Sequence, residues 1–280
     1  MGISRTTVST GIVWTCVFLF ALLLPASADA EWRLYGDFEL GISTATGKTS
    51  GENIIAPQFP PHGSDSDSSP LIGMALGIES PLDQATAWNP PFGMRWPRWT
   101  LRTESEFIFL RDYEYKTEGV VGAVEVPYFT QTDTWTFMQN FLVDMPLLPL
   151  YRPITWVSKH LRGPARLPAL KRVLRPMRFD VGAGVGFADT GLYTTDNNSE
   201  ARESEINFAW QARAGFGYEV TRHVTLMAGY RYVDLGSTSA PLVSVSDPDV
   251  LRGSFSIDQT AHEFRAGIRV YYFEFESPWH

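Results

Sequence analysis

Apolar and polar positions alternate with a period of two along much of this chain, most regularly in its last third. From 207 to 219, apolar side chains occupy every even position, including Phe208, Trp210, Phe216 and Tyr218, while most odd positions are polar or glycine. Successive side chains of a β-strand point to opposite faces. The segment is therefore predicted to be a strand with one apolar face and one polar face.

The same alternation predicts eight strands in all. A short polar turn at 221–223 separates two of them, and the runs upstream show the pattern less regularly. Each run is close to the length of about 9–11 residues that a tilted strand needs to cross a bilayer. The predicted strands are Trp32–Ser43, Leu71–Glu79, Trp99–Leu110, Thr132–Asp144, Met177–Asp189, Asn207–Glu219, Val224–Tyr232 and His262–Tyr272.

The composition of the two faces decides between a soluble barrel and a membrane barrel. The apolar face is large and aromatic, whereas the opposite face mixes glycine with charged residues such as Glu106 and Arg231. Small and long polar side chains together can fill the narrow interior of an eight-stranded barrel. Arg or Lys facing lipid at the bilayer midplane would cost about 2–4 kcal/mol. The pattern thus favours a closed eight-stranded antiparallel up-and-down transmembrane β-barrel, with a soluble barrel as the alternative.

The lengths of the connections agree with this topology when both termini lie in the periplasm. The turn Glu219–His223 then lies on the periplasmic side, and four long polar connections are predicted as extracellular loops. Aromatic residues are expected in two girdles at the membrane interfaces. The loops are Thr44–Pro70, Tyr113–Gln131, Thr190–Ser204 and Gly236–Asp258; the inner girdle is Trp32, Tyr218 and Tyr272, and the outer girdle is Phe208, Trp210, Tyr230 and Tyr232.

The first thirty residues are predicted to be a cleavable signal peptide. Arg5 precedes an apolar run at 12–24, which is too short for a membrane helix, and Ala28-Asp29-Ala30 supplies a small-x-small cleavage site. The alternative is an uncleaved anchor. The only cysteine, Cys16, lies in this segment, so the mature barrel domain, residues 31–280, is expected to contain no disulfide. These features predict the outer membrane of a Gram-negative bacterium.

The run from Phe208-Ala209-Trp210-Gln211 to Gly229-Tyr230-Arg231-Tyr232 resembles the OmpA-like and opacity porin family of small outer-membrane porins and surface antigens. The run His262-Glu263-Phe264-Arg265-Ala266-Gly267-Ile268-Arg269 is similar to the last strand of that family. This resemblance covers roughly the final third of the chain. It implies an eight-stranded barrel whose variable outer loops meet other molecules or cells.

Charged residues on the predicted lumenal face are expected to pair and close the lumen, because an unpaired charge in a confined low-dielectric space is costly. The four arginines of this set are predicted to pair with the four glutamates. A narrow pore for small solutes is the alternative. The predicted lumenal charge network consists of Glu39, Glu104, Glu106, Arg213, Arg231, Glu263, Arg265 and Arg269.

Candidate catalytic and metal-binding residues are few. His262 and Glu263 are adjacent on one strand, so they point to opposite faces and cannot form a dyad. His62-Gly63-Ser64 lies in a predicted outer loop, where a preorganised nucleophile is not expected. The acidic run Asp65-Ser66-Asp67-Ser68-Ser69 could hold calcium but lacks the glycine and the closing glutamate of a defined calcium loop. No catalytic residue, metal site or cofactor is therefore assigned, and a lipid-modifying enzyme is the least favoured reading.

A basic segment at 146–176 is predicted to be a periplasmic insertion. Leu167, Leu170, Leu174 and Met177 recur at helical spacing, and Pro168 suits a first helical turn. A short amphipathic helix of this kind could lie on anionic head groups or contact the cell wall; the alternative is a solvated connector. Its basic patch consists of Arg166, Lys171, Arg172, Arg175 and Arg178.

Together these features predict a non-enzymatic outer-membrane protein with a structural role and a surface-binding or adhesion role through its outer loops. The expected partners are outer-membrane lipids including lipopolysaccharide, the barrel assembly machinery, and an extracellular or host ligand. The formal net charge of −8 argues against nucleic acid as a partner.

Overall fold

The computed structural model describes residues 32–54, 60–82, 99–121, 124–148 and 168–275. The predicted signal peptide, the segment 149–167 and the end of the chain after Phe275 lie outside these residues. No helix in the described ranges is both long enough and apolar enough to span a membrane.

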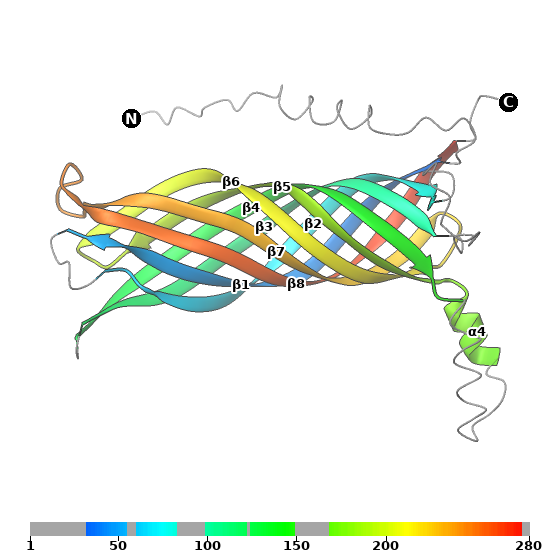
Figure 1. The fold of residues 1–280 in the computed structure, drawn as a ribbon, viewed down its shortest axis with the longest axis horizontal. Coiled ribbons are helices and arrows are strands. Elements are labelled where there is room, and N and C mark those ends of the chain that lie inside the picture. The colour runs from blue at the N-terminus through cyan, green and yellow to red at the C-terminus, as the bar shows by residue number, and fades with distance from the viewer. Residues whose placement is uncertain (1–31, 55–59, 83–98, 122–123, 149–167, 276–280) are drawn as a thin grey trace, which may run out of the picture.

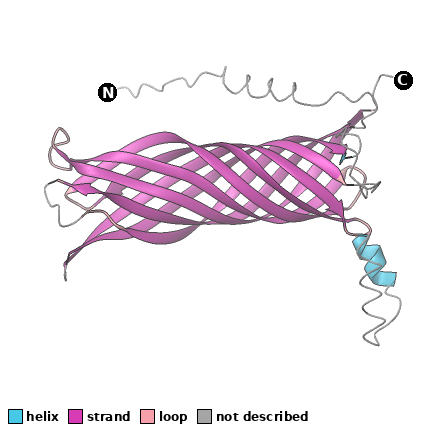
Figure 2. Ribbon diagram, viewed as in Figure 1, coloured by secondary structure: helices cyan, strands magenta, loops and turns pink. Residues whose placement is uncertain are grey.

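Eight antiparallel strands form a closed barrel in which each strand pairs with the next and β1 pairs with β8 (Figures 1 and 2). This confirms the predicted fold class. One short helix, α4 (Pro168–Leu174), precedes β5 at one end of the barrel. The strands are β1 (Trp32–Asn53), β2 (Gly63–Pro81), β3 (Thr100–Val121), β4 (Val124–Pro146), β5 (Met177–Thr195), β6 (Ser199–Glu219), β7 (Val224–Ser244) and β8 (Leu251–Phe275).

The strands are about twice as long as the sequence pattern predicts. They contain 19 to 25 residues each, and the additional residues lie at the end opposite α4. The four long outer loops were therefore wrongly predicted, because most of these residues continue the strands. For example, β1 runs on to Asn53 and β2 begins at Gly63, so little of Thr44–Pro70 remains as a loop.

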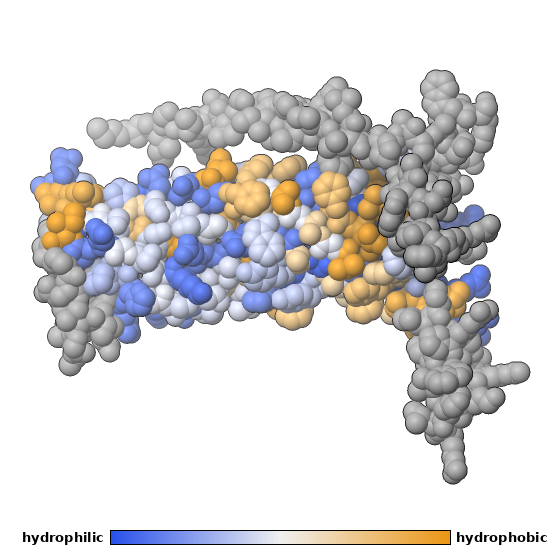
Figure 3. Space-filling model, viewed as in Figure 1, coloured by the Kyte–Doolittle hydropathy of each residue, from blue (hydrophilic) through white to orange (hydrophobic). Residues whose placement is uncertain are grey.

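The half of the barrel next to α4 carries an apolar outer surface, which is visible as the orange region toward that end in Figure 3. Ile42 is 61% exposed and Phe264 67% exposed. Phe38, at the middle of this band, pairs with Met74 on one side and Ile268 on the other. The band is about ten residues deep along each strand, as the hydrocarbon core of a bilayer requires. We call this half the membrane zone.

The opposite half, the outer zone, has the reverse polarity. Its outer surface is polar, and hydroxyl pairs such as Thr44–Ser68 and Thr46–Ser66 join β1 to β2 there, with oxygen–oxygen distances of 2.9 and 2.8 Å. Apolar side chains pack in its interior beside buried, hydrogen-bonded polar ones such as Thr130 and Gln259, and burial of apolar area stabilises a protein that faces water. The interior cluster is Ala45, Tyr113, Tyr115, Tyr128, Met138, Ala188, Leu192, Ala201, Ala209, Val233, Leu235, Ala240, Leu242, Phe255, Ile257 and Ala261.

Two gaps in the strand pairing divide the outer zone into two sheets. Pairing of β2 with β3 ends at Ile72 and Phe109, and pairing of β6 with β7 is interrupted between Glu200 and Trp210. Both gaps lie beside irregular backbone, since Leu110 has a φ of 67° and Gly236 a φ of 82°. Above the membrane zone, β3–β6 therefore form one sheet and β7, β8, β1 and β2 form the other.

Side chains bridge the gap between β2 and β3. The backbone N–H of Lys116 donates to Asp65 at 2.7 Å, and that of Glu114 donates to Asp67 at 2.9 Å. Ser69 accepts from the N–H of Asp112 at 3.0 Å. The acidic run that could have held calcium thus lies in β2. Its carboxylates accept hydrogen bonds from β3 N–H groups that would otherwise pair with backbone carbonyls of β2.

Candidate functional site

The lumen of the membrane zone is filled by charged side chains centred on Glu106. Arg231 donates to one oxygen of Glu106 at 3.0 Å, and Arg265 forms a short ion pair with the other. Asn140 and Gln211 donate to the same carboxylate at 3.1 and 2.8 Å. Hydrogen bonds to a carboxylate from several charged and polar donors are the condition under which a buried charge is tolerated.

Glu263 is the centre of a second group of charged contacts, beside the group around Glu106. It accepts from the Nε of Arg231 at 2.6 Å, and the Nε of Arg111 lies 2.9 Å from its other oxygen. The hydroxyl of Ser43 also donates to it at 3.1 Å and itself accepts from the hydroxyl of Tyr113 at 2.6 Å. This chain of contacts joins the charged network to the core of the outer zone.

Glu104 connects the network toward the end of the barrel next to α4. Arg213 donates to it at 2.5 Å and Tyr35 at 2.9 Å. Arg102 lies 3.6 Å from Glu104 and 2.6 Å from Asp144. Positive and negative side chains therefore alternate along the lumen rather than gathering by sign.

The predicted network residues are brought together, with one difference in pairing. Glu39 contacts Arg265 at 2.6 Å and Arg213 at 3.6 Å. Arg269 was predicted to pair with a glutamate, but it forms a two-pronged contact with Asp37 at 2.8 and 2.7 Å. Asp37 is the residue directly opposite Arg269 across the β1–β8 pair, so its short side chain is the nearest acceptor.

Sequence reasoning missed several residues of this network. Arg102 and Asp180 lie on the polar faces of predicted strands, so strict application of the alternation would have found them. Arg111 could not be found this way, because the irregularity at Leu110 shifts the alternation of β3 by one residue. The neutral members Asn140 and Gln211 carry no charge signal, although both are fully buried.

The aromatic residues of the predicted girdles lie on the outer surface. Tyr218 and Tyr272 are exposed near the inner end, where β1 begins with Trp32. The other four lie near the middle of the barrel's length rather than at its far end, because the strands continue into the outer zone. They mark the outer edge of the membrane zone: Phe208, Trp210, Tyr230 and Tyr232.

His262 belongs to this outer aromatic edge and not to the lumen. Its Nδ1 lies 2.5 Å from the hydroxyl of Tyr230, and its ring contacts Tyr232 with centroids 5.4 Å apart. Glu263 points inward, as the alternation requires. His62 forms an isolated bridge with Glu118 at the outer end of the barrel. Among the described residues, no three His, Cys, Asp or Glu side chains are grouped to hold a metal ion.

The basic patch is divided by the structure. Lys171, Arg172 and Arg175 are exposed on or just after α4, which begins at the predicted Pro168. Met177, which continues the helical spacing and was also predicted to begin a strand, is the first residue of β5. Arg178 was placed in the patch, yet it lies at the inner rim of the lumen, 3.3 Å from Glu79 and 2.7 Å from Glu219. Arg166 lies outside the described residues.

Comparisons with known proteins bear on this architecture. A family model described as an outer membrane protein beta-barrel domain matches residues 15–269. No curated protein matches the chain. Similar solved structures include Neisserial surface protein A, at 14% identity over 84% of this chain and 97% of that chain, with a TM-score of 0.34.

Two other solved structures are similar at the level of the fold. OprG from Pseudomonas aeruginosa is 14% identical over 85% of this chain and 96% of its own, with a TM-score of 0.45. The outer membrane protease OmpT from Escherichia coli is 9% identical over 86% and 97%, with a TM-score of 0.41. The closed ring of eight strands, the apolar outer band and the family match together assign this chain to the outer membrane protein beta-barrel domain family.

Proposed function

We propose that this protein is a non-enzymatic surface protein of a Gram-negative outer membrane, with a closed lumen and a projecting outer zone that binds other molecules or cells. Its roles are structural in the bilayer and adhesive above it. The extracellular or host ligand is met by the faces of the extended strands, rather than by long loops. Lipopolysaccharide is expected around the aromatic edge, and the barrel assembly machinery is expected to insert the chain.

The observation that carries this proposal is the filling of the barrel in both zones. Arg231 and Glu263 have an exposed fraction of 0% in the lumen near the outer edge of the membrane zone, and Leu242 and Phe255 also have 0% in the outer zone. An ion that crossed the barrel would have to break a hydrogen-bonded charge network and then a packed interior of apolar and hydrogen-bonded hydroxyl side chains. Both steps are costly, which favours a closed barrel over the narrow porin.

Conductance in planar bilayers tests the closed lumen. The refolded protein, added to a bilayer in concentrated potassium chloride, is expected to give no stepwise current, whereas an open porin added to the same bilayer as a control does. Stable current steps from the refolded protein would support the narrow porin and overturn the closed barrel. Mass spectrometry of lipids from cells with and without the protein tests the enzyme alternative, and a modified lipid would overturn the non-enzymatic assignment.

A further inference from the structure

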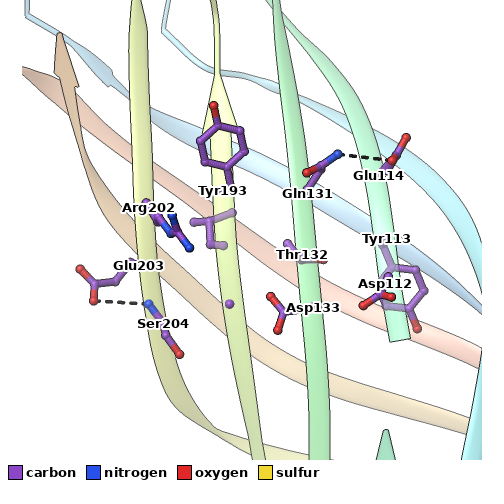
Figure 4. A pocket seen from close by; sticks show the side chains of 12 residues that line it. Asp112, Tyr113, Glu114, Gln131, Thr132, Asp133, Tyr193, Arg202, Glu203 and Ser204 are labelled. Atoms are coloured by element: carbon purple, nitrogen blue, oxygen red, sulfur yellow. Dashed lines mark hydrogen bonds between the residues drawn. The ribbon is translucent and has the colours of Figure 1, made fainter. Parts of the chain in front are cut away.

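The outer face of the β3–β6 sheet carries a groove of about 960 Å³ in the outer zone (Figure 4). The two gaps in pairing lie on either side of this sheet, because β3 and β6 have lost their ladder contacts with β2 and β7 at this level. The groove lies beyond the membrane zone and faces the surroundings of the cell.

Two rows of residues cross this groove. One row runs through Asp112, Asp133, Gly191 and Ser204, which are direct partners on successive strands. The parallel row runs through Glu114, Gln131, Tyr193 and Arg202. Tyr113, Thr132 and Leu192 lie between the rows; their side chains are buried in the interior of the barrel, so the backbone at these positions forms the floor of the groove.

The first row places two like charges directly opposite each other. Asp112 and Asp133 are cross-strand partners, and both side chains are exposed. Like charges in this position destabilise a sheet. A β-carbon at Gly191 would lie 2.2 Å from a carboxylate oxygen of Asp133, so the glycine leaves room for that carboxylate over the β5 backbone.

The groove is acidic, and no cation in the described part of the chain forms an ion pair with its carboxylates. Within the described residues, no Lys or Arg lies within ion-pair distance of Asp112, Glu114, Asp133 or Glu203. The carboxylates of the lumenal network, by contrast, are paired with arginines. Arg202 is the cation of the groove and extends from β6 toward its middle in Figure 4.

From this charge distribution we propose that the groove binds an extended basic polypeptide segment of a partner protein. A Lys or Arg side chain of the partner lies between Asp112 and Asp133 and removes their mutual repulsion. The exposed ring of Tyr193 in the second row offers a further contact to a cation of the segment, and Arg202 donates to backbone carbonyls of the segment. The inference rests on the proposed surface-binding function and names the chemistry of its partner.

The test uses the full-length protein in detergent micelles and a fluorescent peptide of alternating Lys and Ser, with an Asp and Ser peptide of equal length as the negative probe. Fluorescence anisotropy is expected to show binding of the basic peptide alone. D112N/D133N should weaken it at least tenfold, since both partner carboxylates are neutralised. The matched control, Glu52→Gln with Asp249→Asn, removes equal charge from exposed positions away from the groove and should leave binding unchanged.

A second variant tests whether a loss of binding in D112N/D133N could come from altered folding instead of the lost charges. Gln131→Lys places a cation beside Glu114 and Asp112 without altering either carboxylate, and it should also abolish binding. Equal weakening by the control pair, or unchanged binding in both groove variants, would overturn the proposal. Conductance measured on the same preparations tests the closed lumen separately from the peptide-binding groove. Current steps would reject the closed lumen without affecting the peptide result.

Discussion

Single residues show how the closed lumen depends on paired charges. Glu106 contacts three arginines, each of which also contacts another carboxylate, so its removal would leave these buried arginines with one negative charge too few among them. Removal of one partner of a buried pair is strongly destabilising because the other charge remains desolvated. A charged side chain at the inner rim is different, since water reaches it.

Glu106→Gln and Arg231→Gln are each expected to lower the free energy of unfolding by about 3–5 kcal/mol. The double variant should lose clearly less than the sum, because neither charge is then left alone. Urea unfolding from lipid vesicles measures all three. Arg33→Gln is the control and should cost no more than about 1 kcal/mol, since this partly exposed arginine lies 4.0 Å from Glu79. Additive losses would show that the two side chains do not interact.

Individual strands show how much of the fold could be predicted from the sequence and why the rest could not. The membrane zone was predictable because large apolar side chains alternate there with polar ones. The outer zone was not, because its exposed face consists of Ser, Thr and Asp, which are also typical of loops. Its inward face, with residues such as Tyr113, Tyr115 and Phe255, continues the alternation with inverted polarity. Arg111 points into the lumen only because the backbone irregularity at Leu110 shifts the alternation of β3, and the local sequence pattern does not predict that irregularity.

The gap between β2 and β3 leads to a prediction about backbone exchange. Asp65→Ala with Asp67→Ala removes the acceptors for the N–H groups of Lys116 and Glu114, which no β2 carbonyl replaces in a ladder. Hydrogen–deuterium exchange at 112–116 is expected to accelerate at least tenfold. Ser68→Ala, on the exposed side of the same strand, should leave that segment unchanged. Unaltered exchange in the double variant would mean that β2 and β3 pair directly in solution.

The whole molecule is divided by the plane in which its outer surface changes from apolar to polar. Met74 lies at the middle of the apolar band, and Ser66 lies on the same strand and the same face within the outer zone. A charged side chain is therefore expected to have opposite consequences at these two positions. This comparison measures where the bilayer ends on the barrel.

Met74→Arg is expected to destabilise the barrel by about 2–4 kcal/mol, the cost of an arginine facing lipid at the midplane. Ser66→Arg should change stability by less than about 0.5 kcal/mol, as surface substitutions usually do. Both are measured by reversible urea unfolding in vesicles of phosphatidylcholine. A similar loss at both positions would place lipid against the outer zone and contradict the division into two zones.

The continuation of the strands beyond the bilayer has a consequence for immune recognition. Alternate residues of neighbouring strands form the exposed surface, so side chains that lie next to one another outside the cell come from distant parts of the sequence. Antibodies raised against intact cells would then recognise discontinuous epitopes. These antibodies should lose reactivity when the protein is denatured. Synthetic peptides with the sequences 112–133 or 189–206 should neither be bound by these antibodies nor elicit antibodies that recognise the folded protein.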